Sequence, residues 1–188
     1  MRSIAFVLSL LVGGTVATAQ RPIPAARLAR GTLSFDGHAT TGDFVGTTDS
    51  VRGEMTGAPD LAAVRGWVEG AVATLHTGNG KRDKDLRKSM VVDSFAAMRF
   101  DLTGVAPGAV HGDSGVVTLH GRLTIHGVAR DVDVPAHVSF GPDTIRVRSD
   151  FPLNLKDYRI GGLSKLLGLL KMHEGIEVHV DVAFVKSR

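Results

Sequence analysis

The 188-residue sequence predicts an all-β protein whose antiparallel strands form a sandwich or a closed barrel. Hydrophobic and polar residues alternate with a period of two over most of the chain, which is typical of strands with one buried face. Turn sequences such as Gly141-Pro142-Asp143 separate these runs at hairpin spacing. Only two short segments have a helical pattern, so the regularly alternating helices that a parallel sheet needs are missing.

The first 19 residues have the pattern of a cleavable signal peptide. Arg2 is followed by a short apolar run and then by Ala17-Thr18-Ala19, a small-x-small sequence that signal peptidases accept. The run is shorter than the roughly 20 apolar residues that span a bilayer. We therefore expect Gln20 to begin the mature protein and the protein to be periplasmic or secreted. Because residue 20 is not cysteine, a lipid anchor on an N-terminal cysteine is excluded.

The rest of the chain suits one domain. We expect residues 20–30 to be a lead-in, because it contains Pro22 and Pro24, and residues 31–188 to form the barrel. The sequence has no cysteine, so stability must come from burial, for which its 43% hydrophobic residues are sufficient. The formal charge of +3 is small and mixed, which argues against nucleic acid as a partner. No second apolar stretch reaches membrane-spanning length, and a homodimer is a compatible assembly.

The strands are predicted in order from this alternation. The clearest run is residues 131–140, in which Val132, Val134, Ala136, Val138 and Phe140 share one face. The full set gives eight or nine strands and comprises residues 31–38, 43–48, 51–56, 64–76, 97–105, 116–127, 131–140, 144–151 and 176–184.

One predicted helix follows the turn at Asn79-Gly80 and covers residues 81–88. Its charges alternate in sign, so we expect Arg82 and Asp83 to make local hydrogen bonds or ion pairs. A solvated structural helix is favoured over a phosphate-binding one.

The second predicted helix is a leucine stripe at residues 163–172, after Gly161-Gly162. The i, i+3, i+4, i+7 spacing indicates one apolar helical face. This helix would either pack permanently on the core or serve as a lid over the mouth of the barrel. The stripe consists of Leu163, Leu166, Leu167 and Leu170.

No catalytic or metal-binding constellation is found in the sequence. Gly112-Asp113-Ser114-Gly115 resembles a serine-protease nucleophile loop, but the following residues and the histidine order do not match. Glu177, His179 and Asp181 would spread about 13 Å along one strand, too far for one ion. We expect no enzyme activity, no metal and no cofactor.

Three motifs in order resemble the YceI-like family of polyisoprenoid-binding proteins. They are the opening strand at residues 33–46, a Thr-Gly-x-x-x-Arg-Asp-x-x-Leu-Arg signature at residues 77–87, and a Gly-x-Leu-Thr-x-x-Gly-Val strand at residues 121–128. The chain departs from the family pattern at Asp85, where histidine is common, and lacks a proline in residues 93–100.

This resemblance implies a single, extended, lipocalin-like barrel of eight antiparallel strands with two short helices. It also implies a non-enzymatic carrier or reservoir for a long apolar lipid, such as a polyisoprenoid or an isoprenoid quinone. The alternatives are a solid-core interaction or stress-response module and an enzyme acting on a lipid. From the apolar faces, the expected lumen lining is Phe35, Phe100, Leu123, Ile125, Val134, Phe140, Val147, Phe151, Val178 and Phe184.

Export is expected to remove residues 1–19, because the small-x-small pattern lies directly after the apolar run. N-terminal sequencing of the exported protein should read from Gln20. A sequence that starts at Met1 would contradict this prediction.

Overall fold

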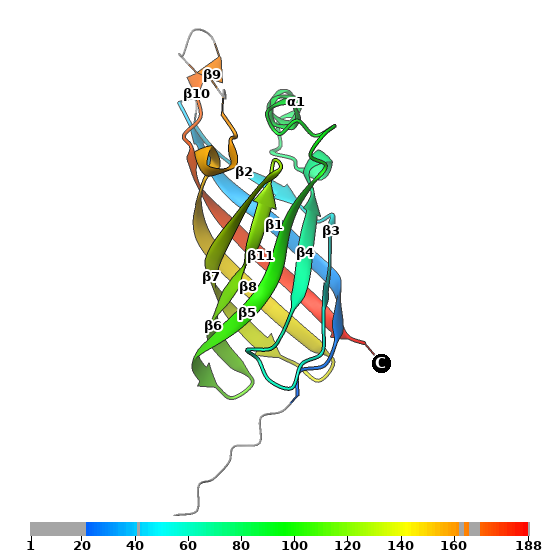
Figure 1. Ribbon diagram of the computed structural model, residues 1–188. Coiled ribbons are helices and arrows are strands. Elements are labelled where there is room, and N and C mark those ends of the chain that lie inside the picture. The colour runs from blue at the N-terminus through cyan, green and yellow to red at the C-terminus, as the bar shows by residue number, and fades with distance from the viewer. Residues whose placement is uncertain (1–21, 41, 162–163, 166–169, 188) are drawn as a thin grey trace, which may run out of the picture.

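The computed structural model describes residues 22–40, 42–161, 164–165 and 170–187, and it shows a closed antiparallel barrel of eight strands (Figure 1). The predicted fold class is therefore confirmed. The barrel strands are β1 (Ala26–Ala39), β3 (Val51–Met55), β4 (Gly66–Ala71), β5 (Ala97–His111), β6 (Ser114–Ile125), β7 (Val128–Phe140), β8 (Thr144–Asn154) and β11 (Gly175–Lys186). A further strand, β2 (Gly42–Thr48), pairs with the upper half of β1 and leads into β3.

Pairing between the first and last strands closes the sheet. Residues 26–36 of β1 run antiparallel to residues 177–186 of β11, with one irregularity after Leu28. Most other neighbours are joined by hairpins, as expected from the turn signals. The β6–β7 turn has His126 and Gly127 at φ values of 51° and 73°, the left-handed geometry that hairpin turns of two residues favour.

The wall is split between β7 and β8. These strands pair only through residues 137–140 and 145–148, whereas β7 pairs with β6 along its whole length. Above this short ladder, no backbone pairing joins the two strands among the described residues. Pro135, which lacks an N–H, lies where the ladder ends, and its carbonyl accepts a hydrogen bond from Ser149 Oγ at 2.6 Å instead.

The predicted charged helix is confirmed as α1 (Gly80–Ser89), in the connection between β4 and β5. Asn79 caps its N-terminus by accepting from the N–H groups of Lys81 and Arg82. The expected local bonds are also present. Asp83 accepts from Thr77 N–H and Oγ1, at 2.8 and 2.6 Å, while Arg82 donates to Thr77 Oγ1 and its carbonyl, at 2.8 and 2.9 Å.

Two short 3₁₀ helices complete the description, η1 (Val72–Thr74) and η2 (Leu155–Tyr158). The predicted strand over residues 64–76 is therefore too long, because the chain turns into η1 after Ala71. No helix among the described residues is long and apolar enough to cross a bilayer.

The prediction of a helix at residues 163–172 is wrong where the structure describes them. Residues Ser164–Lys165 and Leu170–Lys171 form the antiparallel strands β9 and β10, while Leu163, Leu166 and Leu167 lie outside the described residues. Met172 then bridges to Ala39, and His173 N–H donates to the His38 carbonyl at 2.8 Å. Pairing with the end of β1 fixes the chain in an extended form, and this overrides the helical leucine spacing.

The lead-in is also shorter than expected, because β1 begins at Ala26. Ala26 is 1% exposed and pairs with both Lys186 and Met55, so sheet partners extend the strand below Gly31.

The alternating residues face as predicted. In β7, Val134 and Val138 are each 6% exposed, and in β11 Val182 and Phe184 are 2% and 5% exposed. Their neighbours, such as His137, lie on the exposed outer wall. The register is therefore the one that places apolar side chains inside the barrel.

A new charge at adjacent positions on β7 should change the free energy of unfolding by very different amounts. Val138→Asp places an unpaired carboxylate in the interior and should lower the free energy of unfolding by about 4 kcal/mol. His137→Asp, one residue away on the outer wall, should change it by less than about 0.5 kcal/mol. Urea denaturation of both variants measures this contrast, and equal effects would contradict the register.

Candidate functional site

The interior of the barrel contains a cavity of about 230 Å³. It lies between two hydrophobic clusters, and residues of both line it. The lower cluster includes Val105, Val138 and Ile145, and the upper cluster includes Leu75, Met90, Leu153 and Ile160. Residues of both clusters thus form one continuous apolar wall around a hollow interior.

The cavity is elongated along the barrel. On β5 alone its lining runs from Met98 to Val105, which corresponds to roughly 23 Å of strand. With the usual strand tilt, this is roughly 18 Å along the barrel axis.

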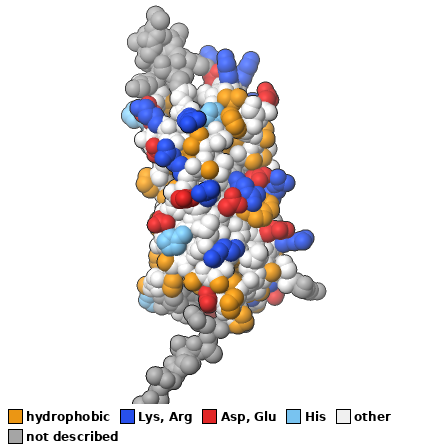
Figure 2. Space-filling model, viewed as in Figure 1, with side chains coloured by type: hydrophobic (Ala, Val, Ile, Leu, Met, Phe, Trp, Pro, Cys, Tyr) orange, Lys and Arg blue, Asp and Glu red, His pale blue; other side chains and the backbone are white. Residues whose placement is uncertain are grey.

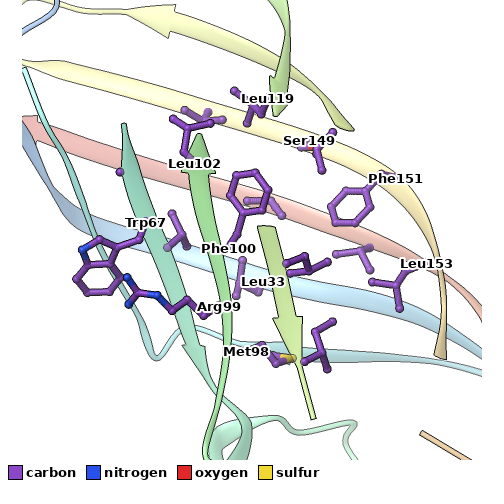
Figure 3. A pocket seen from close by; sticks show the side chains of 18 of the residues that line it. Leu33, Trp67, Met98, Arg99, Phe100, Leu102, Leu119, Ser149, Phe151 and Leu153 are labelled. Atoms are coloured by element: carbon purple, nitrogen blue, oxygen red, sulfur yellow. The ribbon is translucent and has the colours of Figure 1, made fainter. Parts of the chain in front are cut away.

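All ten residues expected to line the lumen surround this one cavity. Phe100 and Phe151 point into it from β5 and β8, as Figure 3 shows. Other members of the wall were not predicted from the sequence, including Leu33, Met98, Leu102 and Leu119. The same alternation could have found them, because each lies on an apolar strand face.

Several interior side chains are only half-buried because they face the void. Leu102, Leu119, Val147 and Val180 lie on inward faces and line the cavity, yet each keeps an accessible surface. In a solid barrel core these positions would contact one another across the axis. Their residual exposure therefore measures unfilled space.

Glycines facing aromatic rings keep this space open. Phe35 on β1 lies over Gly46 on β2, and a Cβ built on Gly46 would be 2.2 Å from its ring. Phe100 lies over Gly121 in the same way, at 2.3 Å. Because the glycines have no side chain, the rings lie against the wall rather than across the lumen. This pairing depends on strand register, so it was not predicted from the alternation of residues.

The lining is almost wholly apolar. Among the described lining residues two carry a charge, Glu54 and Arg99, and both charges are paired, with Arg27 at 3.6 Å and Asp101 at 2.8 Å. Figure 3 shows Arg99 stacked with Trp67 away from the other lining side chains, and its guanidinium carbon is 4.4 Å from the indole centroid. No charged group is therefore directed into the cavity by the residues described.

The helix α1 lies at the upper end of the barrel (Figure 1), where Leu86, Ser89 and Met90 contribute to the lining. Its position is fixed from below, because the Arg82 guanidinium lies 4.1 Å from the centroid of the Phe44 ring. Asp83 also ties the helix to the chain before it, through Thr77. Hydrogen bonds from Thr77 hold the pKa of Asp83 below its ordinary value, so its carboxylate stays charged.

The outer wall carries mixed charges in cross-strand pairs (Figure 2). His179 on β11 joins three strands, with Nδ1 2.6 Å from Asp150 and Nε2 3.2 Å from Asp36. The hydrogen bond with Asp150 raises the pKa of His179, against the effect of partial burial. Within the described part of the chain, no three His, Asp or Glu side chains are arranged to hold a metal ion.

An empty cavity of this size is costly. Unfilled volume in a protein core is unfavourable, because the side chains around it lose contacts that a filled core would supply. Net stabilities are themselves only about 5–15 kcal/mol. Water gains little there, because the apolar lining offers it few hydrogen-bond partners. The site is therefore suited to an apolar guest.

The sequence matches the family model of the YceI-like domain over residues 27–184. The chain belongs to the YceI-like family. The resemblance noted in the three sequence motifs is confirmed by this match, which covers all eight barrel strands but for the ends of β1 and β11. No protein in the curated set is significantly similar to the chain in sequence.

Solved structures share the YceI-like fold at low sequence identity. A polyisoprenoid-binding domain from Saccharophagus degradans, implicated in plant cell wall breakdown, is 17% identical with a TM-score of 0.73, covering 87% of this chain and 99% of that one. BcnA of Burkholderia cenocepacia is 16% identical with a TM-score of 0.70, over 81% and 95%. A mutant YceI protein of Campylobacter jejuni is 15% identical with a TM-score of 0.60, over 100% and 94%.

The Phe35–Gly46 contact should control the shape of the cavity in this YceI-like barrel. Gly46→Ala must displace the Phe35 ring toward the lumen, so it should weaken binding of a fluorescent apolar probe such as N-phenylnaphthylamine several-fold. Gly104→Ala is the matched control, because the nearest atom to a Cβ there is 3.9 Å away. Equal probe affinity in both variants would show that the ring does not limit the cavity.

Proposed function

We propose that this protein binds a long apolar lipid, of the isoprenoid type, inside the barrel and carries or stores it without transforming it. The observation that carries the proposal is the continuous apolar cavity between the two clusters. Each methylene buried there would contribute about 0.8 kcal/mol, and the described part of the wall directs no charged group at the guest.

Two further observations support an isoprenoid-type chain. The cavity is long and narrow, which suits a linear chain better than a globular ligand. The domain from Saccharophagus degradans, which shares the fold, is described as polyisoprenoid-binding. The C. jejuni and B. cenocepacia relatives extend the fold similarity but are named without a ligand.

The same geometry disfavours the alternative functions. An enzyme acting on a lipid needs an acid, base or nucleophile near the guest. The two charged lining residues are instead paired with Arg27 and with Glu69 and Asp101. A solid-core interaction module is disfavoured by the cavity itself.

We place this activity outside the cytoplasm, in the periplasm or in the medium. The signal-peptide pattern of residues 1–19 supports this location. A cysteine-free barrel also needs no oxidation step after export.

Filling the cavity should prevent binding. Native mass spectrometry of the exported protein should detect a co-purifying lipid, and Leu119→Trp on the inward face of β6 should remove it. Val116→Trp adds similar bulk to the exposed face of the same strand, where Val116 is 41% exposed, and should retain the lipid. Leu119→Trp should also melt at or above the wild-type temperature, because the ring fills a void.

A wild-type protein that is always free of lipid, and that takes up no added isoprenoid alcohol such as geranylgeraniol, would refute the proposed function. Turnover of the added lipid would favour the enzyme instead.

A further inference from the structure

The outer side of α1 has a composition that the cavity does not explain. Leu86, Ser89 and Met90 turn toward the lumen, so the opposite side of the helix faces solvent at the upper end of the barrel. Lys81, Lys84 and Lys88 are all exposed, and their i, i+3, i+7 spacing places them in one stripe. We call these three residues the lysine face. Figure 2 shows Lys and Arg side chains grouped at this end.

The two acidic residues of the helix, Asp83 and Asp85, are outnumbered by its five Lys and Arg residues, so they offset this charge only in part. Asp83 is directed toward the barrel, where Thr77 N–H and Oγ1 both donate to its carboxylate. No ion pair with a carboxylate joins any member of the lysine face within the described part of the chain. The helix therefore presents excess positive charge outward.

An apolar side chain lies beside the lysine face. Val91 follows α1 directly, is 43% exposed and has φ of 47°. A β-branched residue rarely adopts this left-handed conformation. Because the Val91 side chain is exposed, packing within the chain does little to offset the strain. Basic residues next to an exposed apolar one are the combination found where proteins dock on membrane surfaces.

We propose that the lysine face and Val91 dock the upper end of the barrel on a bilayer that contains anionic phospholipid. The inference rests on the proposed function, because it names where the apolar guest is exchanged. The lumen-lining side of α1 and the membrane-facing side belong to one helix, so docking places the end of the cavity next to the bilayer. The guest then moves between bilayer and lumen without crossing bulk water.

The helix is held firmly enough to serve as a platform. Arg82 is bound to Thr77 and stacked on Phe44, and Asn79 caps the first turn. These contacts use the backbone N–H of Lys81 but no lysine side chain of the lysine face. Neutralising the lysine face should therefore leave the fold and the cavity intact.

The test is co-sedimentation of the exported protein with vesicles of phosphatidylcholine alone or with 30% phosphatidylglycerol. The wild type should bind only the anionic vesicles, and less at high salt. The triple variant Lys81→Gln/Lys84→Gln/Lys88→Gln should lose roughly 100-fold in apparent affinity, at roughly fivefold per lysine. Val91→Asn, which tolerates the left-handed conformation, should weaken binding several-fold at unchanged melting temperature.

The matched control removes equal charge from the wall. Arg30→Gln/Arg122→Gln/Arg148→Gln alters exposed side chains that neither line the cavity nor pair with a residue that does, and it should bind within about twofold of wild type. Equal losses in both triple variants, or none in the lysine variant, would overturn the proposal. Displacement by millimolar inorganic phosphate, but not by chloride of equal ionic strength, would also overturn it, in favour of a single phosphate site.

Uptake of geranylgeraniol from ethanol separates this proposal from the function on which it rests. Equal uptake by wild type and lysine variant, with vesicle binding lost only in the variant, supports both. Lysine-dependent vesicle binding without any uptake of geranylgeraniol would refute the proposed lipid-binding function but would support the membrane-docking surface.

Discussion

The pairing of β1 with β11 closes the sheet, and closure fixes the distance across the interior. Eight strands leave room for one layer of side chains from each side, or for a single narrow guest. Whether that room is filled then depends on side-chain size. Toward the two ends, buried Val, Ile and Leu side chains and Met90 pack into two clusters. In the middle, rings folded over glycines leave the axis open. Closure and glycine placement together produce the lumen.

Much of this architecture follows from local sequence. Period-two alternation is sufficient to assign the strands, because each strand of a barrel has one face inside and one in solvent. The same alternation selected ten residues that all prove to line one cavity. The charged helix was predictable too, since Asn79 is a strong N-cap and the residues after it favour helix.

Other features depend on contacts between distant segments. The leucine spacing after Gly162 favours a helix, but pairing of Met172 and His173 with the end of β1 favours extended chain. A hollow interior cannot be told from a solid one by alternation, because both need apolar inward faces. To recognise the hollow interior one needs the strand register that places Gly46 opposite Phe35, and this is a pairing across a hairpin. Pro135 was a readable signal that the ladder to β8 stops, since proline is rare inside a fully paired strand.

The split between β7 and β8 affects the girth of the barrel. Widening a closed sheet elsewhere would break a continuous ladder of backbone hydrogen bonds, but above residues 137–140 the described residues hold these two strands together only through side chains and η2. Arg130 donates to the Asp157 carbonyl at 2.7 Å, and His126 lies 3.2 Å from the Tyr158 carbonyl. Such contacts can lengthen or exchange with water at little cost, so the upper half of the tube is compliant while the lower half is stiff. A barrel that is hydrogen-bonded along its whole lower girth and joined by side chains above would hold the proposed guest tightly at its lower end and adjust to bulges, such as methyl branches, at its upper end.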